Sequence, residues 1–256
     1  MITYCEPEKP GRGSLIRANN LKRVAIHQPN YLPWLGFFDK MSQSDVFVIL
    51  DDVQFPKGAP GTWINRTQIA VNGKPRWISV PVRRPSGLQT IEAVQYVDQT
   101  WKKSHRSIIH DCYRNADHYR AQCDLLDELF EPTERESLMH FNLNAIKLIL
   151  ARLASDDQQK MVMASSLGTT ASGSARLVEI VQKVNGGTYL CGAGSEGYLQ
   201  PQQFADAGFN LVFQNFREDA RPQLGTSEFI KGLSILDSLI MLGARETSQL
   251  IGAHSL

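Results

Sequence analysis

Two hydrophobic runs near the start of the chain end abruptly in polar residues. Val24-Ala-Ile26 runs directly into His27-Gln28, and Pro29 prevents this first strand from continuing. The second run, Val46 to Leu50, ends in the same way at Asp51-Asp52. Branched and aromatic residues in short runs are typical of buried strands. We therefore predict two strands of a parallel sheet that place polar side chains at their carboxyl ends, where such sheets bind ligands.

The rest of the chain alternates between helical periodicity and further short hydrophobic runs. Apolar residues spaced for one helix face predict a first helix that begins near Tyr31 or Leu35. The same spacing predicts further helices at 101–113, 119–131, 138–154, 172–184 and 235–242. The residues 204–208 are typical of the end of another helix. Short runs predict strands at 161–166, 188–191 and 211–214. This order predicts an α/β fold with a parallel, Rossmann-like sheet.

A hairpin and several loops interrupt this order. The segments 63–70 and 76–82 flank Asn72-Gly73, which favours a type I′ turn, and we predict that the second arm joins the main sheet. The loop at 55–63, rich in proline and glycine, is a candidate lid over a ligand. We predict a loose amino-terminal extension at 1–20 and one α/β domain at 21–250, in which 100–155 is mainly helical.

The composition limits the classes of ligand and the cellular location that we expect for this protein. The 27 basic and 26 acidic residues give a net charge of +1 with no long run of either sign, so neither nucleic acid nor a membrane is expected as the main ligand. The four cysteines are scattered without a CxxC pair, which favours reduced thiols. No apolar run has the length of a membrane span, and residues 1–20 lack the hydrophobic region of a signal peptide. We expect a cytoplasmic protein, and the oligomeric state stays open.

The polar residues predict one crevice for a small-molecule substrate. His27 has the titration range of a general base, and Asp51 or Asp52 could orient it or hold a substrate ammonium. The expected binding residues are Gln28, Asn30, Tyr31, Gln54, Asn65, Arg66, His105, Arg176, Gly192 and Gly194.

Each of these residues also has a structural explanation that the sequence leaves open. His27 could be a buried structural histidine, and the two aspartates could cap a turn. Asn65 and Arg66 could pack in the hairpin, Arg176 could form an ion pair on a helix face, and His105 could be a surface residue. The residues Tyr31, Trp34, Trp63 and Trp77 could belong to the core or its rim instead of binding a sugar.

Several motifs occur in a fixed order between residues 24 and 242. They are His27-Gln-Pro-Asn-Tyr-Leu-Pro-Trp-Leu-Gly36, Asp51-Asp-Val-Gln54, Asn65-Arg66, the strand 77–82, Trp101-Lys-Lys-Ser-His105, Ser174-Ala-Arg-Leu177, Thr188-Tyr-Leu-Cys-Gly-Ala-Gly194 with Tyr198-Leu199, and Leu233-Ser-Ile-Leu-Asp237. Together they resemble the WbqC-like family of bacterial O-antigen and polysaccharide gene clusters. That family usually has serine where this chain has Cys191, which puts a hydroxyl role there in doubt.

The resemblance implies a glycine or other aminoacyl transferase that modifies an amino sugar. For such a reaction, Asn30, Gln54 and Asn65 would bind sugar hydroxyls, and Arg66, His105 and Arg176 would bind phosphates or the acyl donor. The glycine-rich loop that contains Gly192 and Gly194 would donate amides to an oxyanion or a phosphate. We therefore expect an acyl or aminoacyl transferase acting on an amino-sugar nucleotide, or alternatively a non-catalytic nucleotide-sugar binding protein of the same pathway.

The opening unit is also similar in fold to the HUP class of nucleotide-binding domains, which implies an ATP-dependent adenylate-forming enzyme or nucleotidyltransferase. However, Trp34-Leu-Gly-Phe37 stands where that class has H-x-G-H. The cofactor is open: ATP with Mg²⁺ is conceivable, and no resident metal is expected because close-spaced histidine or cysteine pairs are missing.

Overall fold

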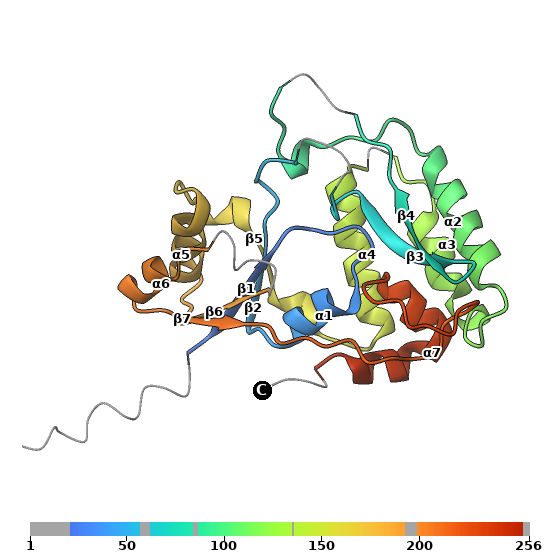
Figure 1. Ribbon diagram of the computed structural model, residues 1–256. Helices are drawn as coiled ribbons and strands as arrows, with labels where there is room; N and C mark the ends of the chain where they lie inside the picture. Colours follow the sequence, from blue (N-terminus) through green and yellow to red (C-terminus); the bar gives the residue numbers. More distant parts are fainter. Residues whose placement is uncertain (1–20, 57–61, 84–86, 135, 193–198, 253–256) are drawn as a thin grey trace, which may run out of the picture.

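A parallel five-stranded sheet forms the centre of the protein. The computed structural model describes residues 21–56, 62–83, 87–134, 136–192 and 199–252. The strand order is β5-β2-β1-β6-β7, and every neighbouring pair is parallel (Figure 1). The strands are β1 (Arg23–His27), β2 (Val46–Ile49), β5 (Met161–Met163), β6 (Thr188–Cys191) and β7 (Asn210–Phe213). The prediction of an α/β fold with a parallel sheet is confirmed.

Helices cover both faces of this sheet. The helices are α1 (Leu35–Ser42), α2 (Thr100–Tyr113), α3 (Cys123–Phe130), α4 (Leu138–Arg152), α5 (Gly173–Lys183), α6 (Pro201–Asp206) and α7 (Ile235–Leu250). Successive strand residues point to opposite faces. Val24 and Ile26 accordingly pack with residues of α5 and α6, whereas Ala25 packs in the larger core with residues of α1, α4 and α7. The predicted final helix at 235–242 is confirmed as the first part of α7, since the helical backbone is interrupted at Gly243, where φ is 80°, before a second helical part continues to Leu250.

The strand order fixes where a ligand crevice can form. Counting only the parallel strands in chain order, the sheet reads 3-2-1-4-5, so the direction of winding reverses between β1 and β6. Loops at the carboxyl ends of these two strands leave in opposite directions, which opens a crevice at this switch point. The β1–β6 pairing ends at Ala25 and Leu190, while the β1–β2 pairing continues to His27 and Ile49. The end of β1 therefore lies at the edge of the predicted crevice.

The predicted hairpin forms, but it does not join the main sheet. Strands β3 (Arg66–Val71) and β4 (Lys74–Ser79) pair only with each other among the described residues. Asn72 and Gly73 have φ values of 50° and 71°, as a type I′ turn requires. The hairpin lies beside α2 (Figure 1), where the backbone amide of Ala70 donates a hydrogen bond to the Tyr113 hydroxyl. The prediction that its second arm extends the main sheet is wrong, because helices occupy its neighbourhood.

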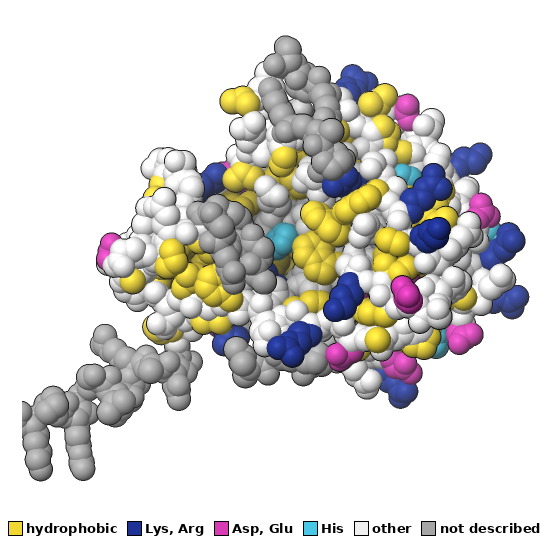
Figure 2. Space-filling model, viewed as in Figure 1, with side chains coloured by type: hydrophobic (Ala, Val, Ile, Leu, Met, Phe, Trp, Pro, Cys, Tyr) yellow, Lys and Arg dark blue, Asp and Glu magenta, His cyan; other side chains and the backbone are white. Residues whose placement is uncertain are grey.

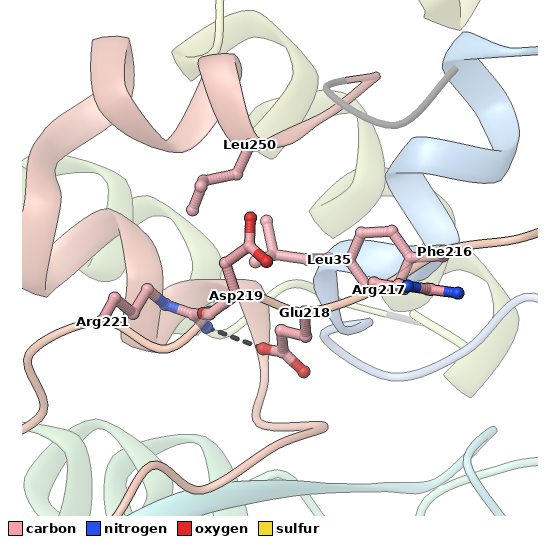
Figure 3. A pocket seen from close by; sticks show the side chains of 7 residues that line it. All are labelled: Leu35, Phe216, Arg217, Glu218, Asp219, Arg221 and Leu250. Atoms are coloured by element: carbon pink, nitrogen blue, oxygen red, sulfur yellow. Dashed lines mark hydrogen bonds and ion pairs between the residues drawn. The ribbon is translucent and has the colours of Figure 1, made fainter. Parts of the chain in front are cut away.

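A buried ionic cluster ties α7 to the segment before it. The Arg221 guanidinium lies 2.8 Å from Glu218 and 3.9 Å from Asp237, and all three side chains are buried. The Asp237 carboxylate also accepts hydrogen bonds from Tyr113 on α2 and from Gln223. A small pocket beside this cluster is lined by Leu35, Phe216, Arg217, Glu218, Asp219, Arg221 and Leu250 (Figure 3). Since Arg221 and Glu218 pair with each other there, the cluster has a structural role.

Some predicted features lie outside the described residues. These are the extension at 1–20, the central part of the candidate lid at 57–61, and Gly194 with most of its loop. Within the described part of the chain, no helix is long and apolar enough to cross a membrane. The same part contains no group of three histidine, cysteine or acidic side chains arranged to hold a metal ion.

Candidate functional site at the switch point of the sheet

His27 stands at the carboxyl end of the central strand with a defined tautomer. Its Nδ1 lies 3.0 Å from the carbonyl oxygen of Gln28. A carbonyl only accepts hydrogen bonds, so Nδ1 carries the proton and Nε2 keeps its lone pair. Among the described residues, Nε2 has no hydrogen-bond partner. This ring nitrogen can therefore accept a proton or a hydrogen bond from a ligand.

The surroundings of His27 keep the imidazole neutral. Its ring makes edge contacts with Phe37 and Trp34, at centroid distances of 4.9 and 5.9 Å. Burial, assisted by the positive charge of Lys40, lowers the pKa of His27 to about 3, and the Gln28 carbonyl opposes this shift. The neutral form thus predominates at physiological pH in the ligand-free protein.

A row of half-buried tryptophans leads away from His27. The ring centroids of Trp34 and Trp63 are 4.9 Å apart, those of Trp63 and Trp77 are 4.7 Å apart, and the Arg66 guanidinium lies 4.0 Å above the Trp77 ring. All three tryptophans are partly exposed. Figure 2 shows hydrophobic side chains around a hollow in the middle of one face, with a histidine side chain inside it. Partly exposed rings of this kind can stack on the apolar face of a sugar or on a nucleobase.

Buried polar contacts hold this row against the end of β1. The side-chain amide of Asn142, fully buried on α4, donates to the carbonyls of Pro29 and Ile64 at 2.8 and 2.7 Å. The Tyr31 amide donates to the Trp63 carbonyl at 2.8 Å. The two segments that carry His27 and Trp63 are thus fixed to each other and to one helix. Such a fixed frame presents a pre-organised surface to a ligand.

The two predicted aspartates bind protein groups on the β5 side of the sheet. The carboxylate of Asp51, which is buried, accepts from the backbone amide and the hydroxyl of Ser165. The carboxylate of Asp52 accepts from one guanidinium nitrogen of Arg176 on α5, at 2.6 Å to each oxygen. Among the described residues neither aspartate hydrogen-bonds to His27, which is oriented by Gln28 instead. The ion-pair explanation for Arg176 is confirmed.

Tyr31 and His105 form a buried pair. The tyrosine hydroxyl lies 2.7 Å from Nδ1 of His105, and the tyrosine ring is stacked on Phe141. Burial lowers the pKa of His105 to about 4, and a backbone hydrogen bond with Ser79 opposes the shift. The alternative that His105 is a surface residue is wrong, because its exposure is 5%. Both residues are buried and pack on Trp101, so their polar groups are used within the protein.

The other predicted binding residues are spread around the same end of the sheet. Gln28 is half-buried and Gln54 is exposed, with a bridge to Thr90. Asn30 is buried and makes no side-chain hydrogen bond among the described residues. Asn65 is a hairpin packing residue, since its amide donates to the Val80 carbonyl. Gly192 follows β6 directly, on the far side of the switch point from β2, and a side chain built there would meet no described atom within 4 Å.

The sequence interpretation missed Lys40. This lysine lies on α1 with an exposure of only 4%, and its ammonium donates to the Ile26 carbonyl at 2.9 Å. Burial lowers its pKa to about 8, opposed by the Cys191 thiol. The sequence carried an indication of this burial, because Asp39-Lys40 stands between Phe38 and Met41 within an apolar helix segment.

Cys191 is buried in the layer under α5 and α6, and its thiol donates to the Val212 carbonyl.

Comparison with known proteins identifies the family. The model of the WbqC-like protein family matches residues 28–249. The chain belongs to the WbqC-like protein family. An uncharacterised protein of Mycobacterium tuberculosis is similar to this WbqC-like protein, with 25% identity over 225 residues that cover 88% of this chain and 95% of that protein. No solved structure matches this WbqC-like chain.

The half-buried His27 and the buried His105 together predict acid sensitivity. In the unfolded chain their pKa values return to 6.5, whereas the folded values are about 3 and about 4. The unfolded state therefore binds more protons between these limits, and the free energy of unfolding falls as pH drops below 6.5. The loss is at most about 1.4 kcal/mol per pH unit for each histidine. Urea unfolding of the wild type and of His27→Gln at pH 7.5, 6 and 5 measures it.

In that experiment the acid-induced loss of stability should be smaller in His27→Gln than in the wild type, because only His105 then contributes. Equal losses in both proteins would contradict the neutral, buried state of His27.

Proposed function

We propose that this protein transfers an acyl or aminoacyl group, with glycine as one candidate, to the amine of an amino-sugar nucleotide in bacterial surface-polysaccharide biosynthesis. The observation that carries the proposal is a neutral histidine with an available Nε2, located at the switch point of a parallel sheet and beside partly exposed tryptophans. Membership of the WbqC-like family agrees with it, given the resemblance to proteins of polysaccharide gene clusters.

The chemistry assigns a step to His27. The amine nitrogen attacks the acyl carbonyl carbon, the new C–N bond forms, and the bond from that carbon to the leaving group of the donor breaks. Nε2 of His27 takes the proton that the amine loses and passes it to the leaving group. A pKa of about 3 makes the ring a weak base in the ligand-free protein. An anionic substrate group nearby would favour the imidazolium and raise this pKa.

The surrounding residues supply binding. Trp34, Trp63 and Trp77 would stack on the sugar or the base, and Arg66 at the end of the row would bind a phosphate. The Asp52 carboxylate, whose side chain is 25% exposed, is the predicted partner for the substrate ammonium.

A second candidate is an ATP-dependent adenylate-forming enzyme or nucleotidyltransferase of the HUP class. The observation in its favour is the strand order, which places a crevice between β1 and β6 as in doubly wound nucleotide-binding sheets. Against it, Trp34 and Phe37 occupy the positions of the two histidines that hold the triphosphate in that class, and both rings pack on His27. We therefore rank it second.

A transfer assay tests the proposal. The purified protein is incubated with amino-sugar nucleotides and three kinds of donor, namely acyl-CoA, a glycyl thioester, and glycine with ATP and Mg²⁺. Mass spectrometry then measures acylated sugar nucleotide, and a coupled assay measures pyrophosphate. An acylated product without pyrophosphate supports the transferase, and pyrophosphate release favours the second candidate. Tight binding of the sugar nucleotide with no product from any donor would contradict both and indicate a binding protein.

A further inference from the structure

Lys40 is a buried cation without a carboxylate partner. No acidic side chain lies within 4.0 Å of its ammonium among the described residues, and its hydrogen bond there is to the Ile26 carbonyl. The neighbouring Asp39 is engaged elsewhere, by the side-chain amides of Gln43 and Gln214 and by the Gly252 amide. Buried charges in proteins are normally paired, because burial without a partner is costly.

A second buried lysine, Lys102, illustrates the difference. Lys102 is 1% exposed, and its ammonium contacts the Glu136 carboxylate at 2.7 Å and the Glu131 carbonyl at 2.7 Å. Lys40 has one comparable acceptor, although an ammonium has three donors. Two of its N–H groups are therefore available to an acceptor that the protein does not supply among its described residues.

The position of Lys40 indicates where that acceptor would come from. The residues of β1 and β6 pair as far as Ala25 and Leu190, and the Lys40 ammonium binds the carbonyl of the very next residue of β1. The amine thus lies at the switch point, one residue before His27.

We propose that Lys40 binds an oxyanion of the substrate, either a phosphate or a carboxylate, at the switch point between β1 and β6. The inference rests on the proposed function only in placing the ligand at this crevice. It also gives Lys40 a second effect. In the ligand-free protein its charge helps to keep His27 neutral, and an anion bound to Lys40 offsets that charge, so that His27 becomes a stronger base when substrate is present.

Anion binding to the full-length protein tests this assignment. Sodium sulfate is added at constant ionic strength against sodium chloride, and the thermal midpoint and calorimetric affinity are measured. Sulfate should raise the midpoint of the wild type by mass action. Lys40→Met should bind sulfate at least about tenfold more weakly, because a charge-assisted hydrogen bond is lost. Lys183→Met, which changes an exposed lysine at the end of α5, should bind sulfate like the wild type.

The pH dependence of the wild type provides a second measurement that needs no variant. Sulfate keeps its charge across the range, so its affinity should fall as pH rises through about 8, where Lys40 loses its proton. Among the described residues, His27 and Cys191 are the titratable groups that interact with Lys40. An anion site made by an arginine would show no such fall in affinity, because a guanidinium stays charged. This profile decides the matter if Lys40→Met fails to fold.

Three results would overturn the assignment: no effect of sulfate on the wild type, unchanged affinity in Lys40→Met, or an affinity that does not vary between pH 7 and 9.5. A parallel titration with acetate separates the two sources of the oxyanion, since a larger effect of sulfate indicates a phosphate and a larger effect of acetate a carboxylate. Because anion binding requires no turnover, a protein that binds sulfate through Lys40 but transfers nothing would contradict the proposed function alone.

Discussion

Replacing His27 with glutamine is expected to lower kcat of acyl transfer by about 10² to 10⁴ fold, the usual contribution of a general base. Glutamine can still form a hydrogen bond but cannot take a proton at neutral pH. The His27 ring also packs on Trp34 and Phe37, so a variant of similar length preserves more of the site than alanine would. Steady-state kinetics with the sugar nucleotide varied measure kcat and KM separately.

KM should change little in this variant, because the tryptophan row and the cations that bind substrate remain. His140→Gln is the matched control, since His140 is exposed on α4, and it should keep the wild-type kcat. A His27→Gln enzyme whose kcat stays within about threefold of the wild type would remove His27 from the mechanism.

Replacing Asp237 with alanine is expected to lower the free energy of unfolding by about 3 to 5 kcal/mol. The Asp237 carboxylate has no exposure, and its removal leaves the buried Arg221 and the Tyr113 hydroxyl short of an acceptor. Guanidinium unfolding followed by circular dichroism measures the change. Asp237→Asn should lose less, because an amide oxygen still accepts from Tyr113.

Asp127→Ala is the control for this loss. Asp127 forms an ion pair with Arg106 at 2.8 Å, but its side chain is 67% exposed, so the pair should contribute less than about 1 kcal/mol. If Asp237→Ala were as mild as Asp127→Ala, the buried cluster would not be what ties α7 to the segment before it.

The hydrophobic pattern predicted the sheet well because burial dictates it. The side chains from Val24 to Ile26 and from Tyr189 to Cys191 are buried between the helices on the two faces of the sheet, and strands buried in this way are typically apolar. The Asn72-Gly73 turn was predictable for a local reason, since its positive φ values suit few residues. The partner of the hairpin was not, because that depends on which distant helices lie beside it.

The candidate site was predicted only in part, because it too depends on contacts between residues far apart in the sequence. The strand end identified His27, but a lysine in a sequence is normally a surface residue, and only the packing of α1 on β1 shows that Lys40 is buried beside it. His105 and Tyr31 carry groups suited to a ligand, yet their tertiary neighbours use those groups within the core. Residue type thus predicts what a side chain can do, and tertiary contacts decide whether it is available.

The most direct test of the central claim is the ring-nitrogen NMR spectrum of His27 during a titration with an amino-sugar nucleotide. The signal can be assigned by its absence from His27→Gln. Without ligand, at pH 6.5, we expect a neutral ring with the proton on Nδ1. On saturation, the Nε2 resonance should shift and the pKa of His27 should rise. A nucleotide that binds tightly and leaves both unchanged would show that the ligand site lies elsewhere.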